Sequence, residues 1–154
     1  MTTEIEGNAR LDPRAYLKHL FDASPFHQQI GFELVEIGYE RLAVRVQNIA
    51  ALRSGKGNLH GGVIASLVDA VGSFHAGVAV QQRAQASADA SEGKRAHRIA
   101  TIDLHVDYLR PLLAEHFIAA TTILHTGAST VRLRAEVRAD DGELVAVASA
   151  NYSY

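Results

Sequence analysis

The chain has 154 residues, which suits one compact domain with a single core. Its net charge of −2 provides no basic field of the kind that nucleic-acid binding needs. The absence of cysteine excludes disulfide scaffolds, thiolate metal sites and cysteine nucleophiles.

The N-terminal region predicts two short helices. Residues 1–10 are polar and lack an apolar stretch, so we expect a frayed end without a signal peptide, and therefore a cytoplasmic protein. Asp12 and Pro13 are suited to the cap and the first position of a helix. Ser24-Pro25 begins a short second turn or helix that ends before Gly31. The first helix would carry an apolar face made of Tyr16, Leu17, Leu20 and Phe21.

Residues 32–47 alternate between apolar and polar positions, with Gly38 in the middle, and this pattern predicts a pair of strands. Residues 53–58 form a loop by composition. Residues 59–80 are almost unbroken apolar sequence, equivalent to about six turns of helix. Asp69 lies in the middle of this run, which favours a helix buried inside protein over a membrane span. A carboxylate in that position must be paired, protonated or functional.

The second half of the chain predicts strands. Residues 81–98 are polar and rich in alanine; their first part could prolong the helix, and the rest predicts a surface loop. Four strands follow, separated by Arg110-Pro111, Gly127 and the hairpin signal Asp141-Gly142; they span residues 99–109, 117–125, 130–138 and 144–152. Hairpins imply antiparallel pairing, and a sheet that covers a single buried helix must curl around it. We therefore expect a single α+β domain, with a curved antiparallel sheet of five to six strands around one long helix and a short N-terminal helix.

Two motifs carry a family resemblance. The first is Asn58-Leu59-His60-Gly61-Gly62, followed by Leu67 and Asp69, and the second is Thr101-Ile102-Asp103 with Asp107-Tyr108-Leu109-Arg110-Pro111. Together they resemble the hotdog-fold acyl-CoA thioesterases of the phenylacetate-pathway type, over most of the chain from about Pro25 to Tyr154. The resemblance implies a hotdog fold, a homodimer or a dimer of dimers, and hydrolysis of an acyl-CoA thioester. We also expect no cofactor, no metal, and neither a nucleic acid nor a membrane as partner.

The motif residues match the chemistry of thioester hydrolysis, which needs an attacking group and a donor for the developing oxyanion. Asp69 can activate water or attack the carbonyl directly. The resemblance assigns the backbone N–H of Gly61 to the thioester carbonyl, and the helix N-terminus adds partial positive charge there. It also implies that Thr101 orients the carboxylate or the water, and that His60 fixes the turn and the nearby substrate carbonyl.

Three further residues of this region are candidates for substrate binding: Gly62, Asn58 and Ser54. Some relatives carry an asparagine six residues before the histidine, where it helps to hold the nucleophile or the water. Ser54 occupies that position here, and the nearest asparagine is Asn58.

Helix dimensions place a constraint on this site. Gly61 and Asp69 are eight residues apart, which is roughly 12 Å along one helix. A reacting carbonyl must lie about 3 Å from both the donor and the attacking group. We therefore expect a site shared across a two-fold axis, with Asp69 of one subunit facing Gly61 of its partner.

Structural explanations compete with these assignments. Asp69 could be a structural acid, His60 could be a satisfied structural histidine, and Gly61-Gly62 could simply allow close packing. Alternation also places Asp103, His105 and Asp107 on one strand face, which raises a metal site as an alternative to exposed polar residues. We favour exposed polar residues.

Alternative functions on the same fold also exist. A non-catalytic acyl-thioester-binding protein is the main one, although binding alone does not require a buried acid. Hydratases and dehydratases need a catalytic histidine after an asparagine-proline pair, which residues 70–75 lack. A serine hydrolase is unsupported, since no Gly-x-Ser-x-Gly elbow occurs.

Overall fold

The computed structural model describes residues 13–86 and 98–154. Its helices are α1 (Pro13–Asp22), α2 (Pro25–Ile30) and α3 (Gly61–Ala86), with a 3₁₀ turn at Ala50–Leu52. Its strands are β1 (Glu33–Ile37), β2 (Leu42–Gln47), β3 (Ala100–Tyr108), β4 (His116–Thr126), β5 (Thr130–Ala139) and β6 (Leu144–Ser153). The predicted frayed end, the Asp12 cap and the predicted loop within residues 87–97 lie outside the described residues.

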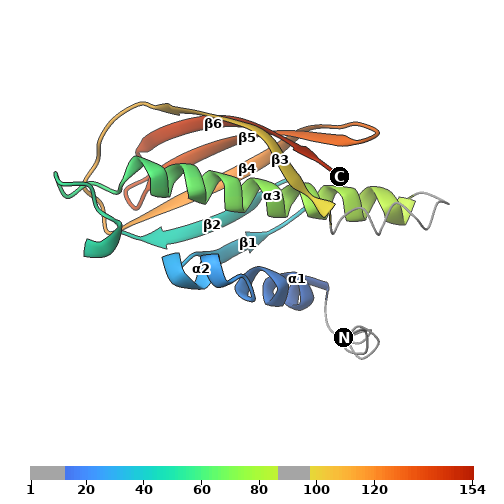
Figure 1. Ribbon diagram of the computed structural model, residues 1–154, viewed down its shortest axis with the longest axis horizontal. Helices are drawn as coiled ribbons and strands as arrows, with labels where there is room; N and C mark the ends of the chain where they lie inside the picture. The colour runs from blue at the N-terminus through green and yellow to red at the C-terminus, as the bar shows by residue number, and fades with distance from the viewer. Residues whose placement is uncertain (1–12, 87–97) are drawn as a thin grey trace.

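The strands form one antiparallel sheet in the order β1-β2-β4-β5-β6-β3. Hairpins join β1 to β2, β4 to β5 and β5 to β6, so sequence neighbours pair directly. β3 follows the long helix and pairs with β6 at the far edge of the sheet. Figure 1 shows α3 running along one face of the sheet, with the strands curving around it. The expected curved antiparallel sheet around one helix is confirmed.

α3 is the central helix, and its buried side faces the sheet because that side is almost entirely apolar. Its buried residues are Ile64, Leu67, Val68, Ala70, Val71, Gly72, His75, Ala76, Ala79 and Val80. By length and composition alone α3 could cross a membrane, but 56% of its apolar window is buried inside the protein. It is therefore the core helix of this fold, as the acid and glycines within it predicted.

α3 continues to Ala86, beyond the apolar stretch that ends at Val80. The added residues, Gln81 to Ala86, are mostly good helix formers, so the helix is locally favourable even where it is exposed. Arg83 attaches this end to the sheet, because its guanidinium donates to the Gly127 carbonyl and lies 3.3 Å from the Tyr154 hydroxyl.

The two predicted N-terminal helices are confirmed. Phe21 of α1 is fully buried and meets the ring of Phe74 on α3 edge to face, with ring centroids 5.3 Å apart. Leu20 was expected on the same buried face, but it is 39% exposed, so Phe21 is the main anchor of α1. Ser24 caps the start of α2, where its hydroxyl accepts from the His27 N–H, and Gly31, with a φ of 78°, caps its end.

His75 is the buried polar residue of α3. Its Nε2–H donates to the Tyr39 carbonyl at 2.7 Å, and its Nδ1 accepts from the Thr121 hydroxyl at 2.8 Å. Both ring nitrogens are therefore satisfied inside the core, as expected for a structural histidine.

Candidate functional site

Asp69 lies midway along α3, where its carboxylate meets two hydroxyl groups from the sheet. Thr101 of β3 donates to its Oδ1 at 2.8 Å. The Tyr152 hydroxyl of β6 lies 3.3 Å from the same Oδ1 and 3.4 Å from the Asp69 backbone carbonyl. Within the described residues, no hydrogen bond or ion pair engages Oδ2. One carboxylate oxygen is therefore held by the protein, and the other is free for a reacting molecule.

Thr101 reaches Asp69 because of an irregularity in β3. Thr101 pairs with Tyr152, whereas Asp103 pairs with Asn151, so Ile102 is an extra residue in the ladder. Strict alternation would place Thr101 and Asp103 on the same face of the sheet. The bulge turns Thr101 toward α3 and leaves Asp103 on the opposite face, where it accepts two hydrogen bonds from the Asn151 side chain.

Tyr152 is a member of this site that the sequence reasoning missed. Its side chain is fully buried. Burial and the negative charge of Asp69 raise the pKa of Tyr152 above its usual range, so the phenol stays protonated and can donate. A Cβ at Gly72 would lie 2.3 Å from the Tyr152 hydroxyl oxygen, so only glycine fits there. A glycine three residues after the acid, on the same side of the helix, was the available signal.

The N-terminus of α3 has an unusual distribution of backbone donors. The Gly62 N–H donates to His60 Nδ1 at 3.0 Å, and the Val63 and Ile64 N–H groups donate to the His60 carbonyl. His60 therefore caps the helix with both its side chain and its backbone. Within the described residues the Gly61 N–H has no acceptor. Of the four N–H groups that a helix leaves unpaired at its start, Gly61 supplies the one that is free.

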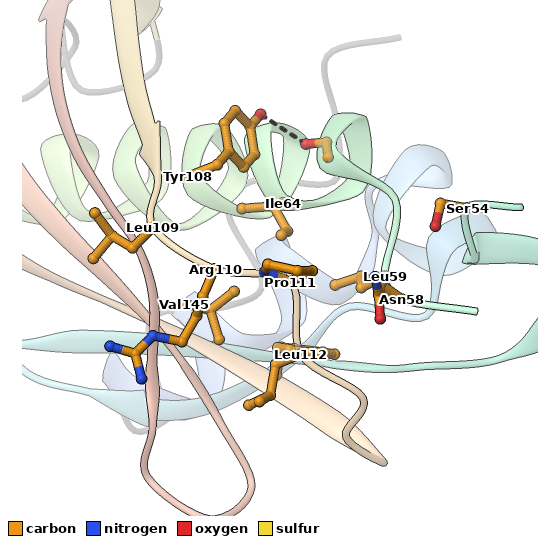
Figure 2. A pocket seen from close by; sticks show the side chains of 12 residues that line it. Ser54, Asn58, Leu59, Ile64, Tyr108, Leu109, Arg110, Pro111, Leu112 and Val145 are labelled. Atoms are coloured by element: carbon orange, nitrogen blue, oxygen red, sulfur yellow. Dashed lines mark hydrogen bonds between the residues drawn. The ribbon is translucent and has the colours of Figure 1, made fainter. Parts of the chain in front are cut away.

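A cavity of about 350 Å³ opens beside Gly61 (Figure 2). Tyr108 lies over the first turn of α3, and its hydroxyl donates to the Gly61 carbonyl at 2.9 Å. Ser54 and Asn58 belong to the turn before α3, which is closed by a bond from the Ser54 N–H to the Asn58 carbonyl. The remaining lining residues are Leu59, Ile64, Leu109, Arg110, Pro111, Leu112, Phe117 and Val145. Most of these lining residues are apolar, with Ser54, Asn58 and Arg110 among the polar ones, which is typical of a site for a ligand with an apolar portion.

The predicted residues thus fall into two groups. Gly61, Ser54 and Asn58 line the cavity at the start of α3, with His60 and Gly62 beside it in the cap. Asp69 and Thr101 form the second group, midway along the helix. Each group includes a residue of α3, Gly61 in the first and Asp69 in the second. The rise of the helix keeps these two residues roughly 12 Å apart along its axis.

The polar face of β3 has its own partners. His105 Nε2 lies 3.2 Å from the Asp107 carboxylate, and Asp103 is bonded to Asn151. Among the described residues, no three histidine or acidic side chains are close enough to share a metal ion.

One long helix packed against a curved six-stranded antiparallel sheet is the arrangement of the hotdog fold. The family model of the thioesterase superfamily matches residues 56–146, and the chain belongs to this superfamily. The medium/long-chain acyl-CoA thioesterase YigI of Escherichia coli is 35% identical over 131 residues, which cover 83% of this chain and 84% of that protein.

Solved structures agree with the fold. A thioesterase-superfamily protein from Shewanella oneidensis superposes with a TM-score of 0.82 at 25% identity, over 90% of this chain and 93% of that one. A thioesterase from Haemophilus influenzae, 17% identical, has a TM-score of 0.75 over 94% of this chain and 91% of that one, and supports the fold alone. The hotdog fold and the thioester-hydrolase class expected from the sequence are confirmed.

Proposed function

We propose that the protein hydrolyses acyl-CoA thioesters in a site shared between two subunits. Asp69 of one subunit is the general base or the nucleophile, and the Gly61 N–H of the partner subunit polarises the thioester carbonyl. The observation that carries this proposal is the separation of two groups on α3. One is the Asp69 carboxylate, whose Oδ2 has no partner among the described residues, and the other is the Gly61 N–H, which has no acceptor there. A reacting carbonyl needs both within about 3 Å, which a single straight helix does not allow.

The proposed reaction is the addition of an oxygen nucleophile to the thioester carbonyl. In one form, Oδ2 of Asp69 removes a proton from water as that water adds to the carbonyl carbon. In the other, Oδ2 itself adds to the carbon and water later cleaves the resulting anhydride. In both, the oxyanion forms at the Gly61 N–H, where the helix N-terminus adds positive potential, and the C–S bond then breaks to release CoA as a thiolate. The thiolate takes up the proton that Asp69 removed from water in the first form, and a proton from solvent water in the second.

The exposed edge of the sheet supports a second copy of this chain as the partner. Among the described residues, β3 pairs with β6 alone, and Ile102, Tyr108 and Leu109 along and beyond this edge are 54%, 54% and 49% exposed. An exposed apolar edge strand is a favourable surface for pairing with another chain. A homodimer, or a tetramer made from two such dimers, would bring Asp69 of each subunit near Gly61 of the other.

The cavity beside Gly61 supports an acyl thioester as the substrate. Its volume of about 350 Å³ lies at the lower end of the range for small-molecule sites. YigI acts on medium- and long-chain acyl-CoA according to its name, whereas the motifs resemble enzymes of the phenylacetate type. We also propose a cytoplasmic location, where acyl-CoA is available.

The test is a thiol-release assay on the wild type and on Asp69→Asn, with short, medium and long aliphatic acyl-CoAs and with benzoyl- and phenylacetyl-CoA. We expect turnover by the wild type and loss of more than about a hundredfold in kcat for the variant, because the free oxygen becomes an amide. Substrate binding by Asp69→Asn should remain. A folded wild type that binds acyl-CoA but releases no thiol would favour the alternative, a non-catalytic acyl-thioester-binding protein.

The oxyanion donor has its own matched pair of variants. Gly61→Pro removes the N–H at the first helical position, where proline is well tolerated, whereas Gly61→Ala keeps the N–H. A methyl group at Gly61 would lie 3.4 Å from the Tyr108 ring, which is an ordinary contact. We expect a large loss of kcat in Gly61→Pro alone, and equal activity of the two variants would contradict the role of this N–H.

A further inference from the structure

We propose that Tyr152 is a positioning residue for the reaction, which together with Thr101 fixes Oδ1 of Asp69 so that Oδ2 faces the thioester. This inference depends on the proposed function of Asp69. Neither the family motifs nor the catalytic assignment includes Tyr152, which lies near the end of the last strand.

The contacts of Tyr152 hold its hydroxyl in one place. The ring is fully buried in a cluster that includes Ala76 and Val80 of α3 and Leu133 of β5. The hydroxyl passes directly under Gly72, where a Cβ would lie 2.3 Å from the phenol oxygen and 2.9 Å from Cζ. A ring packed in this way cannot swing aside, so its hydroxyl is a fixed donor below Asp69.

Two hydroxyls converge on one carboxylate oxygen from two different strands. Thr101 of β3 bonds to Oδ1 at 2.8 Å and Tyr152 of β6 lies 3.3 Å from it. These two residues are directly paired in the sheet, so the ladder between β3 and β6 sets the spacing of the two donors. A carboxylate held through one oxygen from two directions has little freedom to rotate, and its other oxygen keeps a constant direction.

The charges around this pair favour donation by Tyr152. Asp69 on α3 is faced by Tyr152 from β6 and by Thr101 from β3, and it forms no ion pair with the described residues. The ionisable groups that act on Tyr152 are Asp69 and, from the other face of β3, Asp103. Burial and these two negative charges keep the phenol protonated, so its O–H can donate to the Asp69 carboxylate.

Tyr152→Phe tests the proposal, because it removes the hydroxyl and keeps the ring. We expect kcat to fall about three- to tenfold, the usual effect of one lost hydrogen bond, with a much smaller change in KM. The loss should appear in kcat rather than in substrate binding, because the hydroxyl acts on Asp69 and not on the acyl-CoA. A residue that only fills the core would leave the kcat of the folded enzyme close to the wild-type value.

Tyr154→Phe is the matched control. The Tyr154 hydroxyl is partly buried and donates to the Gly127 carbonyl at 2.5 Å, away from Asp69, so this variant also loses one hydrogen-bonded tyrosine hydroxyl. It should keep the wild-type kcat and KM. If Tyr152→Phe and Tyr154→Phe behave alike in both readouts, while Asp69→Asn is inactive, the proposal for Tyr152 is wrong and the function of Asp69 stands. If Asp69→Asn retains activity, the assignment of Asp69 itself is wrong.

A double-mutant cycle gives a second test, in which Thr101→Val and Tyr152→Phe are made singly and together. Thr101→Val and Tyr152→Phe remove two donors to the same oxygen, so their effects on kcat should not multiply. The same cycle made with Tyr154→Phe should give independent effects. Independent effects in both cycles would contradict a shared action on Oδ1.

Discussion

The hydroxyl oxygen of Tyr152 occupies the space that a side chain at Gly72 would need, with 2.3 Å between that oxygen and an ideal Cβ. Gly72 lies three residues after Asp69, so the glycine opens the helix surface beside the acid and lets the phenol approach from β6.

Gly72→Ala should destabilise the protein by about 1–3 kcal/mol, because the added methyl overpacks a buried contact that cannot relax. Gly61→Ala, on the same helix, meets only an ordinary contact and should change the free energy of unfolding much less. Urea unfolding of the two variants makes the comparison. Equal losses would show that the Gly72–Tyr152 contact relaxes easily.

Thr101→Val should lower kcat about tenfold, because it removes the shorter of the two hydrogen bonds to Oδ1. Thr101→Ser keeps the hydroxyl and should retain most of the activity. The thiol-release assay compares the two variants. Activity in Thr101→Val equal to that of Thr101→Ser would rule out a role for the hydroxyl.

His60→Ala should lower the free energy of unfolding by about 0.5–2 kcal/mol, because the Gly62 N–H loses its cap. His60→Asn, which offers a side-chain oxygen to the same N–H, should recover most of that loss. Chemical denaturation measures stability, and the thiol-release assay reports activity on the same samples. If His60→Asn is as stable as the wild type but has lost turnover, His60 also contacts the substrate.

Protein stability should fall as the pH drops below about 6.5, in part because of His75. Burial lowers the pKa of His75, with a smaller opposing effect from its bond to the Tyr39 carbonyl. The folded state therefore binds fewer protons than the unfolded state in this range, so unfolding becomes easier at lower pH. His75→Gln should be less stable near pH 7.5, but its free energy of unfolding should change less between pH 7.5 and 5.5. A free energy of unfolding that changes equally with pH in the wild type and in His75→Gln would contradict this.

The sequence predicted the fold well because the signals were local. The apolar run around Asp69 indicated the core helix, and turn residues such as Asp141-Gly142 indicated the antiparallel hairpins. The extension of α3 to Ala86 was less certain, since exposed polar residues do not show the periodicity of a packed helix.

The interior of the site was harder to predict because it depends on contacts between distant residues. Alternation along β3 would place Thr101 beside Asp103, and only the bulge at Ile102 reverses its direction. Tyr152 is 83 residues from Asp69, and nothing in the pattern of β6 distinguishes it from an ordinary core aromatic residue. The N-terminal cap was predicted as a helix start, but the bond from Gly62 to His60 Nδ1 is a matter of side-chain geometry.

The shared site is tested most directly with heterodimers of Asp69→Ala and Gly61→Pro, purified through two different tags. Each homodimer should be inactive. The heterodimer should regain about half of the wild-type activity, since one of its two sites combines the intact Asp69 of one chain with the intact Gly61 of the other. Folded heterodimers with no activity on a substrate that the wild type hydrolyses would contradict a site built across the two-fold axis.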